Sequence, residues 1–374
     1  MFSNTGLQIF KVAVLVALTI ALPSSVGFKA GIASTVSAAA TGRIVFVSKR
    51  FDAGGDIFRM ASDGTGLQRL TANNTPDECP AVSPNGNWIV YVARKKGEAT
   101  GGIAGTAPLD VVLMNSDGTS PRAIAHFEEG IAECPVWDSG STKFLAIETH
   151  KWRLEPSPPP NTLHVFTVQG AEASAFNTVA RHAEFSPAGD RILLSEVEFD
   201  GTVTRNSIVI RKVDGTGREV LRISSQGLAP AWRPGHDEIA YNCAQGWCSM
   251  RSDGSGERLL APFTPDYLTY SPDGEYVAYQ CAGRQCVMKA EGYDVVRIEA
   301  IASRPRYPSW SPDSGWLAME CERSQPGQFI AHFLQQLRIV GSATNDICIF
   351  NRDGSQIINL TSHPAGDESP GYGQ

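Results

Sequence analysis

Short apolar runs alternate with polar turn segments along most of the chain. The runs are rich in valine, isoleucine and aromatic residues, and the segments between them are rich in glycine, proline, serine and aspartate. Short runs of this composition, bounded by such turn residues, are typical of β-strands. The pattern therefore predicts an all-β protein built from many short strands.

A turn motif recurs in step with these strands. Its six copies read PAVSPNG, PVWDSGS, AEFSPAG, PAWRPGH, LTYSPDG and PSWSPDS, and begin at Pro80, Pro135, Ala183, Pro230, Leu268 and Pro308. Proline presets φ for a tight turn, and the aspartate that often follows can bond its own backbone. A strand-rich repeat with a period near 40 residues predicts a β-propeller or another β array.

Each repeat contains four predicted strands. The second strands follow the turn motif at residues 88–94, 144–150, 192–198, 239–243, 277–281 and 317–321. Third strands end in Asp-Gly, at Asp117, Asp214, Asp253 and Asp353, where glycine accepts the positive φ that a hairpin turn needs. A short fourth strand closes each unit. Four short strands per repeat correspond to one propeller blade.

The two ends of the chain complement each other. Residues 43–72 contain a second, third and fourth strand, RIVFVSKR, DIFRMASDGTG and LQRLTA, but no first strand. Residues 368–372, with a broken motif copy at Pro370, supply a first strand without partners. We therefore expect a composite blade that closes a ring of seven blades and removes its open edges. A six-bladed ring is the alternative, if the terminal segment does not pair.

The repeat also resembles a known family. The pattern P-x-[WFY]-S-P-D-G, followed by an apolar strand and a third strand ending in DG, resembles the TolB-type propeller repeat over residues 43–372. The resemblance implies a propeller, and TolB itself is a periplasmic protein that binds partner proteins. This chain lacks TolB's separate N-terminal α/β domain and has seven repeats rather than six. Similar repeats precede the catalytic domain of prolyl-oligopeptidase-like enzymes, but the sequence contains no G-x-S-x-G motif and no room for a hydrolase domain.

The N-terminal 40 residues have the features of a targeting segment. Lys11 precedes an apolar run over residues 12–22, and small residues follow as far as Ala40. The run is shorter than the roughly 20 residues needed to span a bilayer. We expect a signal peptide at residues 1–40 and a propeller domain at residues 41–374, in the periplasm or outside the cell and free of the membrane after cleavage. An uncleaved N-terminal anchor is the alternative.

The eight cysteines predict disulfides, because their number is even and they follow a secretion signal. Three pairs join the end of a second strand to the start of the third strand in the same hairpin, and the fourth pair precedes the motif proline in neighbouring blades. The predicted bonds are Cys79–Cys134, Cys243–Cys248, Cys281–Cys286 and Cys321–Cys348. A zinc site is the competing interpretation of the two Cys-x4-Cys spacings, but each pair is explained by its own hairpin.

Three insertions interrupt the even spacing of the repeats, at Lys95–Pro108, Lys151–Asn161 and Glu322–Asn345. The third carries an apolar stripe at helical spacing, formed by Phe329, Ile330, Phe333, Leu334 and Leu337. This predicted helix either packs on the propeller's own side or docks a partner; a continuation of the strand pair is the remaining alternative.

The charge pattern limits the classes of partner. The net charge is −7 and no basic block is present, so the sequence has no footprint for nucleic acid.

In a propeller, the loops before the first strands converge on the central channel. By repeat position, its rim collects Asp77, Glu78, Glu133, Arg181, His182, Asp266, Arg306, Asp367 and Glu368. Carboxylates from several blades could hold a divalent cation or a basic peptide, and solvated acids on a loop rim are the alternative.

Two functions fit these features. The first is a secreted or periplasmic, non-enzymatic, monomeric propeller that binds a protein or peptide partner at the channel rim and has no catalytic residue, cofactor or resident metal. The second is a propeller enzyme, a carbohydrate lyase or hydrolase, with its site over the central channel. His182 is the one histidine in the rim set. Its convergence with two carboxylates in a deep pocket would favour the enzyme.

Overall fold

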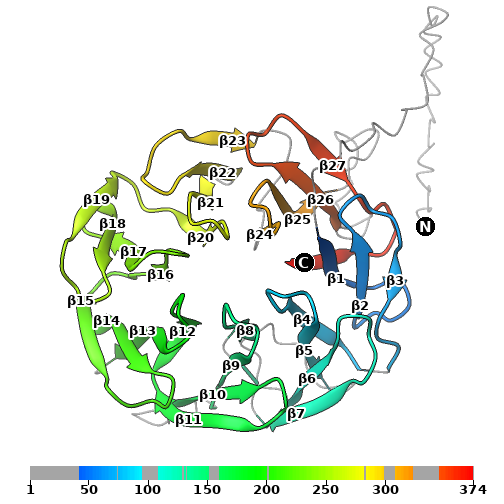
Figure 1. The fold of residues 1–374 in the computed structure, drawn as a ribbon, viewed down its shortest axis with the longest axis horizontal. Coiled ribbons are helices and arrows are strands. Elements are labelled where there is room, and N and C mark those ends of the chain that lie inside the picture. The colour runs from blue at the N-terminus through cyan, green and yellow to red at the C-terminus, as the bar shows by residue number, and fades with distance from the viewer. Residues whose placement is uncertain are drawn as a thin grey trace, which may run out of the picture. The chain divides into compact units, whose positions relative to one another are not determined.

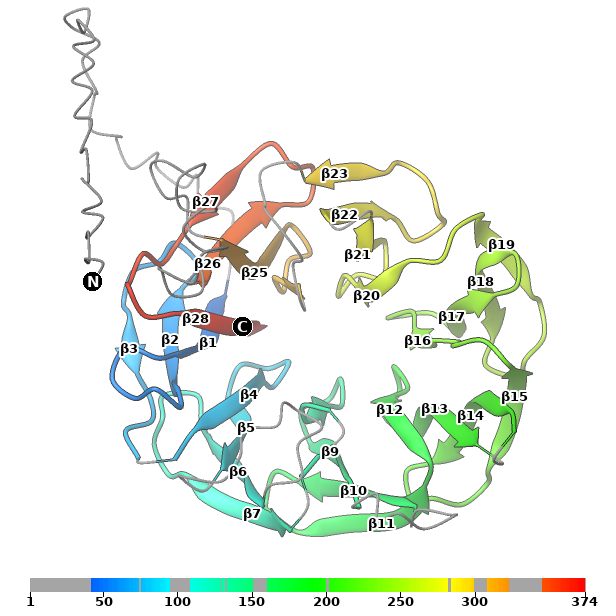
Figure 2. The same ribbon diagram turned by 180° about the vertical axis from the view of Figure 1, so that it is seen from behind.

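Seven four-stranded antiparallel sheets stand around a central channel, which confirms the seven-bladed propeller (Figures 1 and 2). The computed structural model describes residues 42–73, 75–94, 108–128, 130–131, 133–150, 160–199, 202–281, 284–298, 308–322 and 345–373. We number the blades along the chain and call the one that contains β1 blade 1. The predicted signal peptide, Arg306 and the stripe Phe329–Leu337 lie outside the described residues. Within those residues, no helix has the length and apolarity needed to cross a bilayer.

Every blade repeats the same order of strands from the channel outwards. The first strands, next to the channel, are β28 (Asp367–Gly373), β4 (Asp77–Val82), β8 (Val136–Trp137), β12 (Ala180–Phe185), β16 (Ala231–Trp232), β20 (Asp266–Tyr270) and β24 (Ser309–Trp310). The second strands are β1 (Arg43–Ser48), β5 (Trp88–Arg94), β9 (Lys143–Glu148), β13 (Arg191–Phe199), β17 (Glu238–Cys243), β21 (Tyr276–Cys281) and β25 (Trp316–Glu322). The third strands are β2 (Asp56–Ala61), β6 (Leu109–Asn115), β10 (Asn161–Thr167), β14 (Thr204–Lys212), β18 (Gly246–Arg251), β22 (Arg284–Lys289) and β26 (Asn345–Asn351). The outer strands are β3 (Gln68–Arg69), β7 (Arg122–Phe127), β11 (Glu172–Thr178), β15 (Glu219–Ser224), β19 (Arg258–Ala261), β23 (Val296–Ile298) and β27 (Ile357–Asn359).

The ring closes through blade 1, which takes its strands from both ends of the chain. β28 pairs with β1 from Arg43 opposite Gly373 to Ser48 opposite Asp367, and the two strands lie side by side in both ribbon views (Figures 1 and 2). This pairing confirms the composite blade and excludes the six-bladed alternative.

An apolar core fills each of the seven junctions between neighbouring blades. Alternate residues of one second strand serve different junctions. In β1, Val45 and Val47 pack against blade 2, whereas Ile44 and Phe46 pack against blade 7. Because both faces of the blades are buried, central positions of the second and third strands carry consecutive buried apolar residues, as at Ile44–Val47 of β1 and Val111–Met114 of β6, instead of alternating.

The repeated Ser-Pro-Asp motif is a structural turn between the first and second strands. In blade 7, the Trp316 N–H donates a hydrogen bond to Ser311 Oγ at 2.9 Å, and the Gly315 N–H donates to Asp313 Oδ1 at 3.0 Å. Ser271 and Asp273 make the same bonds in blade 6. The turn residues therefore satisfy backbone donors and are not candidates for function.

All four predicted disulfides are present and no cysteine is free. Cys79–Cys134 joins blade 2 to the segment before β8 of blade 3, whereas each of the other three bonds links the second and third strands of one blade. Four disulfides are typical of a protein that folds in an oxidising compartment, such as the periplasm or the extracellular space.

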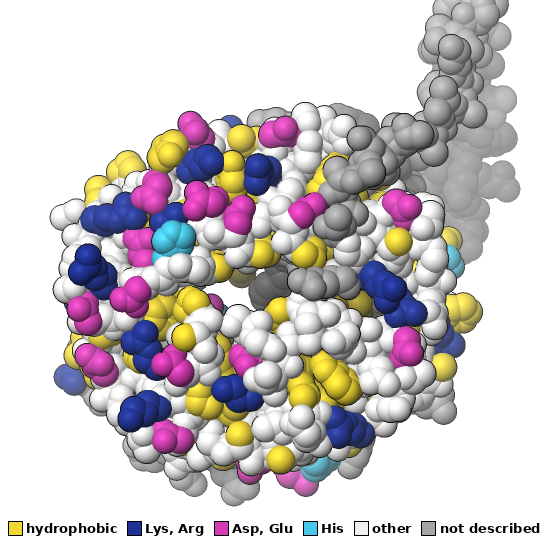
Figure 3. Space-filling model, viewed as in Figure 1, with side chains coloured by type: hydrophobic (Ala, Val, Ile, Leu, Met, Phe, Trp, Pro, Cys, Tyr) yellow, Lys and Arg dark blue, Asp and Glu magenta, His cyan; other side chains and the backbone are white. Residues whose placement is uncertain are grey.

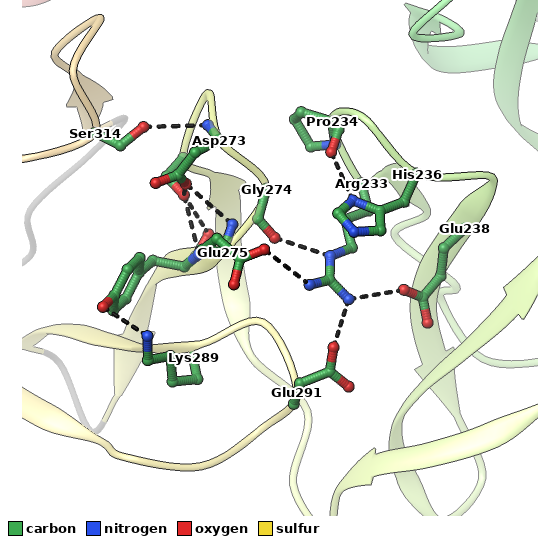
Figure 4. Close-up of polar contacts among 12 residues, drawn as sticks. Arg233, Pro234, His236, Glu238, Asp273, Gly274, Glu275, Lys289, Glu291 and Ser314 are labelled. Carbon is green, nitrogen blue, oxygen red and sulfur yellow. Dashed lines mark hydrogen bonds and ion pairs between the residues drawn. The ribbon is translucent and has the colours of Figure 1, made fainter.

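A buried arginine ties blade 5 to blade 6 on the face that carries the Ser-Pro turns. Arg233 replaces the serine of the motif and is 5% exposed. Its guanidinium donates to the Gly274 carbonyl at 2.8 Å, to Glu238 at 3.0 Å and to Glu291 at 2.6 Å (Figure 4). Basic and acidic side chains are interspersed over this face of the ring, and an opening passes through its centre (Figure 3).

Replacing Arg233 by Ala is expected to lower the free energy of unfolding by about 2 kcal/mol, because the Gly274 carbonyl loses its buried donor and the two glutamates keep only their bonds to the more exposed Arg258. Arg251→Ala is the matched control, since Arg251 is exposed on β18 of the same blade and should change stability by less than about 0.5 kcal/mol. Urea unfolding followed by tryptophan fluorescence measures both. Equal effects of the two substitutions would contradict the structural role of Arg233.

Candidate functional site: the wall of the central channel

The first strands share a distortion just below the channel rim. The pairing of β4, β20 and β28 with their second strands skips residues, at Glu78/Ala81, Asp266/Thr269 and Glu368/Gly371. Inside these bulges, Cys79, Tyr267 and Ser369 have φ angles of 56°, 52° and 54°. Bulges redirect the side chains around them. The rim residues therefore do not simply continue the alternation of their strands.

Two of the predicted rim residues are buried inside the blades. Asp77 and Asp367 are both 0% exposed. Asp77 accepts hydrogen bonds from Asn73 and Thr75, and Asp367 pairs with Arg50 at 2.9 Å. Their position at the rim was predicted from the repeat, but the side chains turn away from solvent. These two carboxylates therefore cannot contact a partner directly.

Asp77 is expected to make stability depend on pH. Burial raises the pKa of Asp77 to about 6 from 3.8, hydrogen bonds from Thr71, Asn73 and Thr75 oppose the rise, and the charge of Asp56 adds to it. Because the folded state holds the proton more tightly than the unfolded state, this group stabilises the fold below pH about 4, and its contribution of about 3 kcal/mol is lost as the pH rises through 6.

The Asp77→Asn variant is therefore expected to lose stability less steeply between pH 4 and 7 than the wild type, and to be at least as stable at neutral pH. Asp367→Asn, the equivalent change in β28, is the control and should be less stable at every pH because Arg50 loses its partner. Thermal melts across this pH range measure both variants. An unaltered pH dependence in Asp77→Asn would contradict the assignment.

Three other rim carboxylates lie beside basic groups. Glu78 pairs with Arg94 at 2.9 Å, Glu368 pairs with Lys49 at 2.9 Å, and Glu133 contacts His182. Arg181 and Asp266 are exposed. Asp266 has no ion-pair partner among the described residues. Because local cations offset much of the rim's negative charge, a binding site depends on particular residues more than on the total charge.

One carboxylate lies deeper in the channel wall. At the register position two residues before the Ser-Pro turn, the first strands carry Ala81, Val136, Glu184, Ala231, Thr269, Ser309 and Gly371, each opposite a buried residue of the second strand. Glu184 is the one charged side chain in this inner ring. It lies two residues beyond His182 in β12, so both side chains are on the same side of that strand.

The backbone of the next blade fixes the Glu184 carboxylate. The Trp232 N–H donates a hydrogen bond to Glu184 Oε1. Arg233 uses its own N–H to pair with the second strand, at Glu238, so the N–H of the preceding residue points to the channel side of β16. In blade 7, Ser309 accepts the Tyr372 N–H in the same manner at 2.9 Å. The Glu184 carboxylate therefore lies at the channel-facing edge of the junction between blades 4 and 5.

His182 belongs to the same cluster and lies closer to the channel rim than Glu184. Its Nδ1 lies 2.7 Å from Glu133 Oε2 of the neighbouring blade, and its side chain is 37% exposed. Burial alone would lower the pKa of His182, but the hydrogen bond and charge of Glu133 and the charge of Glu184 outweigh it and raise the pKa to about 9. His182 is therefore protonated at neutral pH and forms an ion pair with Glu133.

Glu184 itself titrates near neutrality. Burial raises the pKa of Glu184 to about 7, although the His182 charge and the Trp232 N–H favour its ionised form. The side chain is nevertheless partly reachable by water, which is the environment expected in the wall of a narrow channel. A carboxyl group with these properties can bind a cation when ionised, or exchange a proton with a bound molecule.

The junction also leaves a donor unsatisfied. Trp137 and Trp310, at the same register position as Trp232, donate their indole N–H groups to the carbonyls of Ala81 and Thr269 in the preceding blades. The equivalent Nε1 of Trp232 is buried and has no hydrogen-bond partner in the part of the chain that the structure describes. The inner ring of hydrogen bonds is therefore incomplete beside Glu184.

Glu184 was missed by reasoning from the sequence, which searched the loops before the first strands. A signal was available in the repeat alignment. AEFSPAG carries a glutamate where the other copies carry alanine, valine, threonine or serine. Two other histidines lie away from this cluster, His164 in β10 and His236 in the turn between β16 and β17. Among the described residues, no group of three or more His, Cys, Asp or Glu side chains is arranged to hold a metal ion.

Comparison with known proteins supports the fold. No protein-family model matches the chain, and no curated protein matches it in sequence. TolB from Acinetobacter baumannii superposes with a TM-score of 0.53 at 13% identity, covering 89% of this chain and 67% of that one. The β-propeller domain of the Trilobed protease from Pyrococcus furiosus gives 0.59 at 11%, covering 87% and 94%. Oligogalacturonate lyase from Vibrio parahaemolyticus gives 0.56 at 10%, covering 87% of each chain. At these identities the likeness shows a shared propeller fold.

Proposed function

We propose that this protein is a non-enzymatic propeller of the periplasm or extracellular space that binds a cationic segment of a protein or peptide at the mouth of its central channel. The carrying observation is the carboxylate of Glu184, which has an oxygen facing the channel beside the Glu133–His182 ion pair. The disulfides and the fold shared with TolB support the compartment and the class of activity.

The electrostatics of the channel mouth favour a positively charged ligand. His182 and Glu133 cancel each other's charge, whereas Glu184 and Asp266 have no basic side chain bonded to them among the described residues. A small excess of negative charge in a concave site attracts cations and increases their association rate. The effect is local to the junctions of blades 3 to 6 and does not require an acidic surface over the whole ring.

Binding of penta-lysine tests this proposal. Calorimetric titration is expected to show an affinity that falls several-fold between about 20 mM and about 150 mM salt, because exposed charges are screened over about 8–10 Å. The double variant Glu133→Gln/Asp266→Asn should weaken binding. Glu219→Gln removes one charge from the exposed outer strand β15 and is the control that should leave binding unchanged. Binding that is indifferent to salt and to the rim substitutions would overturn the proposal.

A second candidate function is an enzyme that acts on a carbohydrate or peptide in the channel. Two observations favour it: His182 lies beside the carboxylates of Glu133 and Glu184, and the Glu184 pKa of about 7 suits a general acid or base at neutral pH. Binding is the first proposal because His182 is already paired with Glu133 and protonated at neutral pH, so it is not free to act as a base. Turnover of oligogalacturonate or of a peptide library, abolished by Glu184→Gln with folding intact, would favour the enzyme. Binding without turnover would favour the first function.

A further inference from the structure

We propose that Glu184 forms the centre of a subsite inside the channel that binds one primary ammonium group, such as a lysine side chain, and that it binds this group only after releasing its own proton. The inference rests on the proposed function and adds to it a particular chemical group and a form of regulation.

The geometry leaves one position open at Glu184. Its Oε1 already accepts the Trp232 N–H, and its second oxygen has no partner among the described residues. The buried Trp232 Nε1 has no acceptor among the described residues, but an ammonium carries only donors and cannot satisfy it. The vacant acceptor at the junction between blades 4 and 5 is therefore the second oxygen of Glu184. An acceptor in the channel wall needs a donor from water or from a ligand, and a cation with N–H donors can supply one.

The free oxygen selects among cations. A guanidinium binds best when both oxygens of a carboxylate accept its parallel N–H donors. Glu184 offers one fully open oxygen, because the other already accepts the Trp232 N–H and keeps only one lone pair for a ligand, which makes a parallel two-point contact less favourable. An ammonium is a compact point charge that can use a single acceptor. A divalent ion such as Ca²⁺ takes six to eight oxygen ligands, including several carboxylates, which the one open carboxylate of Glu184 does not provide. The site therefore fits a primary ammonium.

Among the groups at this junction, Glu184 is the one whose charge changes over the neutral pH range. His182 approaches from its own strand, and Glu133 from blade 3; together they remain an ion pair of zero net charge over the neutral range. From β16 the site receives a neutral N–H, and Tyr270 of β20 is a neutral phenol whose pKa is raised by burial. The local net charge is therefore near zero when Glu184 is protonated and near −1 when it is ionised. An ammonium ligand displaces the proton.

The coupling between ligand binding and proton release from Glu184 is large enough to measure. The pKa of about 7 for Glu184 means that a ligand restricted to the ionised form binds about tenfold more weakly at pH 6 than at pH 8. The lysine ammonium keeps its charge over this range, and so does His182. Binding should also release about 0.9 proton per site at pH 6, about 0.75 at pH 6.5 and about half a proton at pH 7.

The experiment is calorimetric titration with penta-lysine at pH 6 and pH 8, at constant ionic strength and in two buffers of different ionisation enthalpy. The wild type should show about tenfold tighter binding at pH 8, and a buffer-dependent heat at pH 6.5 that reports proton release. Glu184→Gln should bind penta-lysine weakly at both pH values. Its affinities at pH 8 and pH 6 should be nearly equal, and binding should release no proton. Asp266→Asn should weaken binding equally at both, leaving the ratio unchanged. Penta-arginine should show a smaller ratio than penta-lysine.

The outcomes separate this inference from the proposed function. If penta-lysine binds in a salt-dependent manner but Glu184→Gln keeps the wild-type pH ratio and proton release, the proposed function stands and the subsite is wrong. If penta-lysine does not bind at either pH, the proposed function fails with it. Proton release is measured on the wild-type protein, so its absence overturns the subsite even if Glu184→Gln fails to fold.

Discussion

Deletion of residues 367–374 is expected to cause the largest loss of stability of any change considered, because it removes the strand that closes the ring. The deletion takes away the pairing of β28 with β1, the buried ring of Tyr372 and the partner of Arg50. Loss of a buried ion-pair partner costs about 3–5 kcal/mol, and loss of a large buried aromatic side chain costs a similar amount. The sum approaches the whole stability of a typical domain, about 5–15 kcal/mol.

The truncated protein should therefore melt more than about 10 °C below the wild type, or show no cooperative transition. One change at the same end of the chain acts as the control. Tyr372→Phe should be nearly neutral, because the Tyr372 hydroxyl has no hydrogen-bond partner among the described residues. A melting temperature that is unchanged by the full deletion would contradict closure through the composite blade.

Removal of the Cys79–Cys134 disulfide is expected to have the next largest effect. This bond closes a loop with a sequence separation of 55 residues, whereas Cys243–Cys248 closes one of 5. By the entropy of loop closure, the first should stabilise the fold by about 4 kcal/mol and the second by about 2 kcal/mol. The longer bond also holds blade 2 to blade 3 directly, at the rim of the channel near Glu133.

The test compares two double variants, Cys79→Ala/Cys134→Ala and Cys243→Ala/Cys248→Ala, by denaturant unfolding. The first should lose about twice as much free energy of unfolding as the second. Mass mapping of a non-reduced digest of the wild type checks the four pairings at the same time. Equal losses in the two variants, or any disulfide other than the four assigned bonds, would contradict this assignment.

The fold could be predicted from the sequence because its signals are local and repeated. Each Ser-Pro-Asp turn satisfies its own backbone donors, as at Ser311 and Asp313, so the turn is specified within a few residues. The register of the repeats then places the cysteines, since Cys243 and Cys248 occupy the same hairpin positions as Cys281 and Cys286. The absence of a first strand before Arg43 pointed to the C-terminus, and β28 confirms it.

The candidate site was predicted only in part, because side-chain direction at the rim depends on tertiary contacts. Asp77 and Asp367 lie at the predicted position, but hydrogen bonds and an ion pair draw them into the blades. The contact between His182 and Glu133 depends on how far two neighbouring blades approach each other, which no pattern within one repeat encodes. Glu184 was recognisable only as an exception at an otherwise small and uncharged position of the repeat.

Binding of an ammonium group at Glu184 can be tested directly by a crystal structure of the protein with bound penta-lysine at pH 8. A lysine ammonium is expected at the junction of blades 4 and 5, about 2.8 Å from the free oxygen of Glu184, with Glu133 and His182 still paired beside it. Ligand bound on the outer strands or on the turn face, with the wall around Glu184 holding only water, would contradict it.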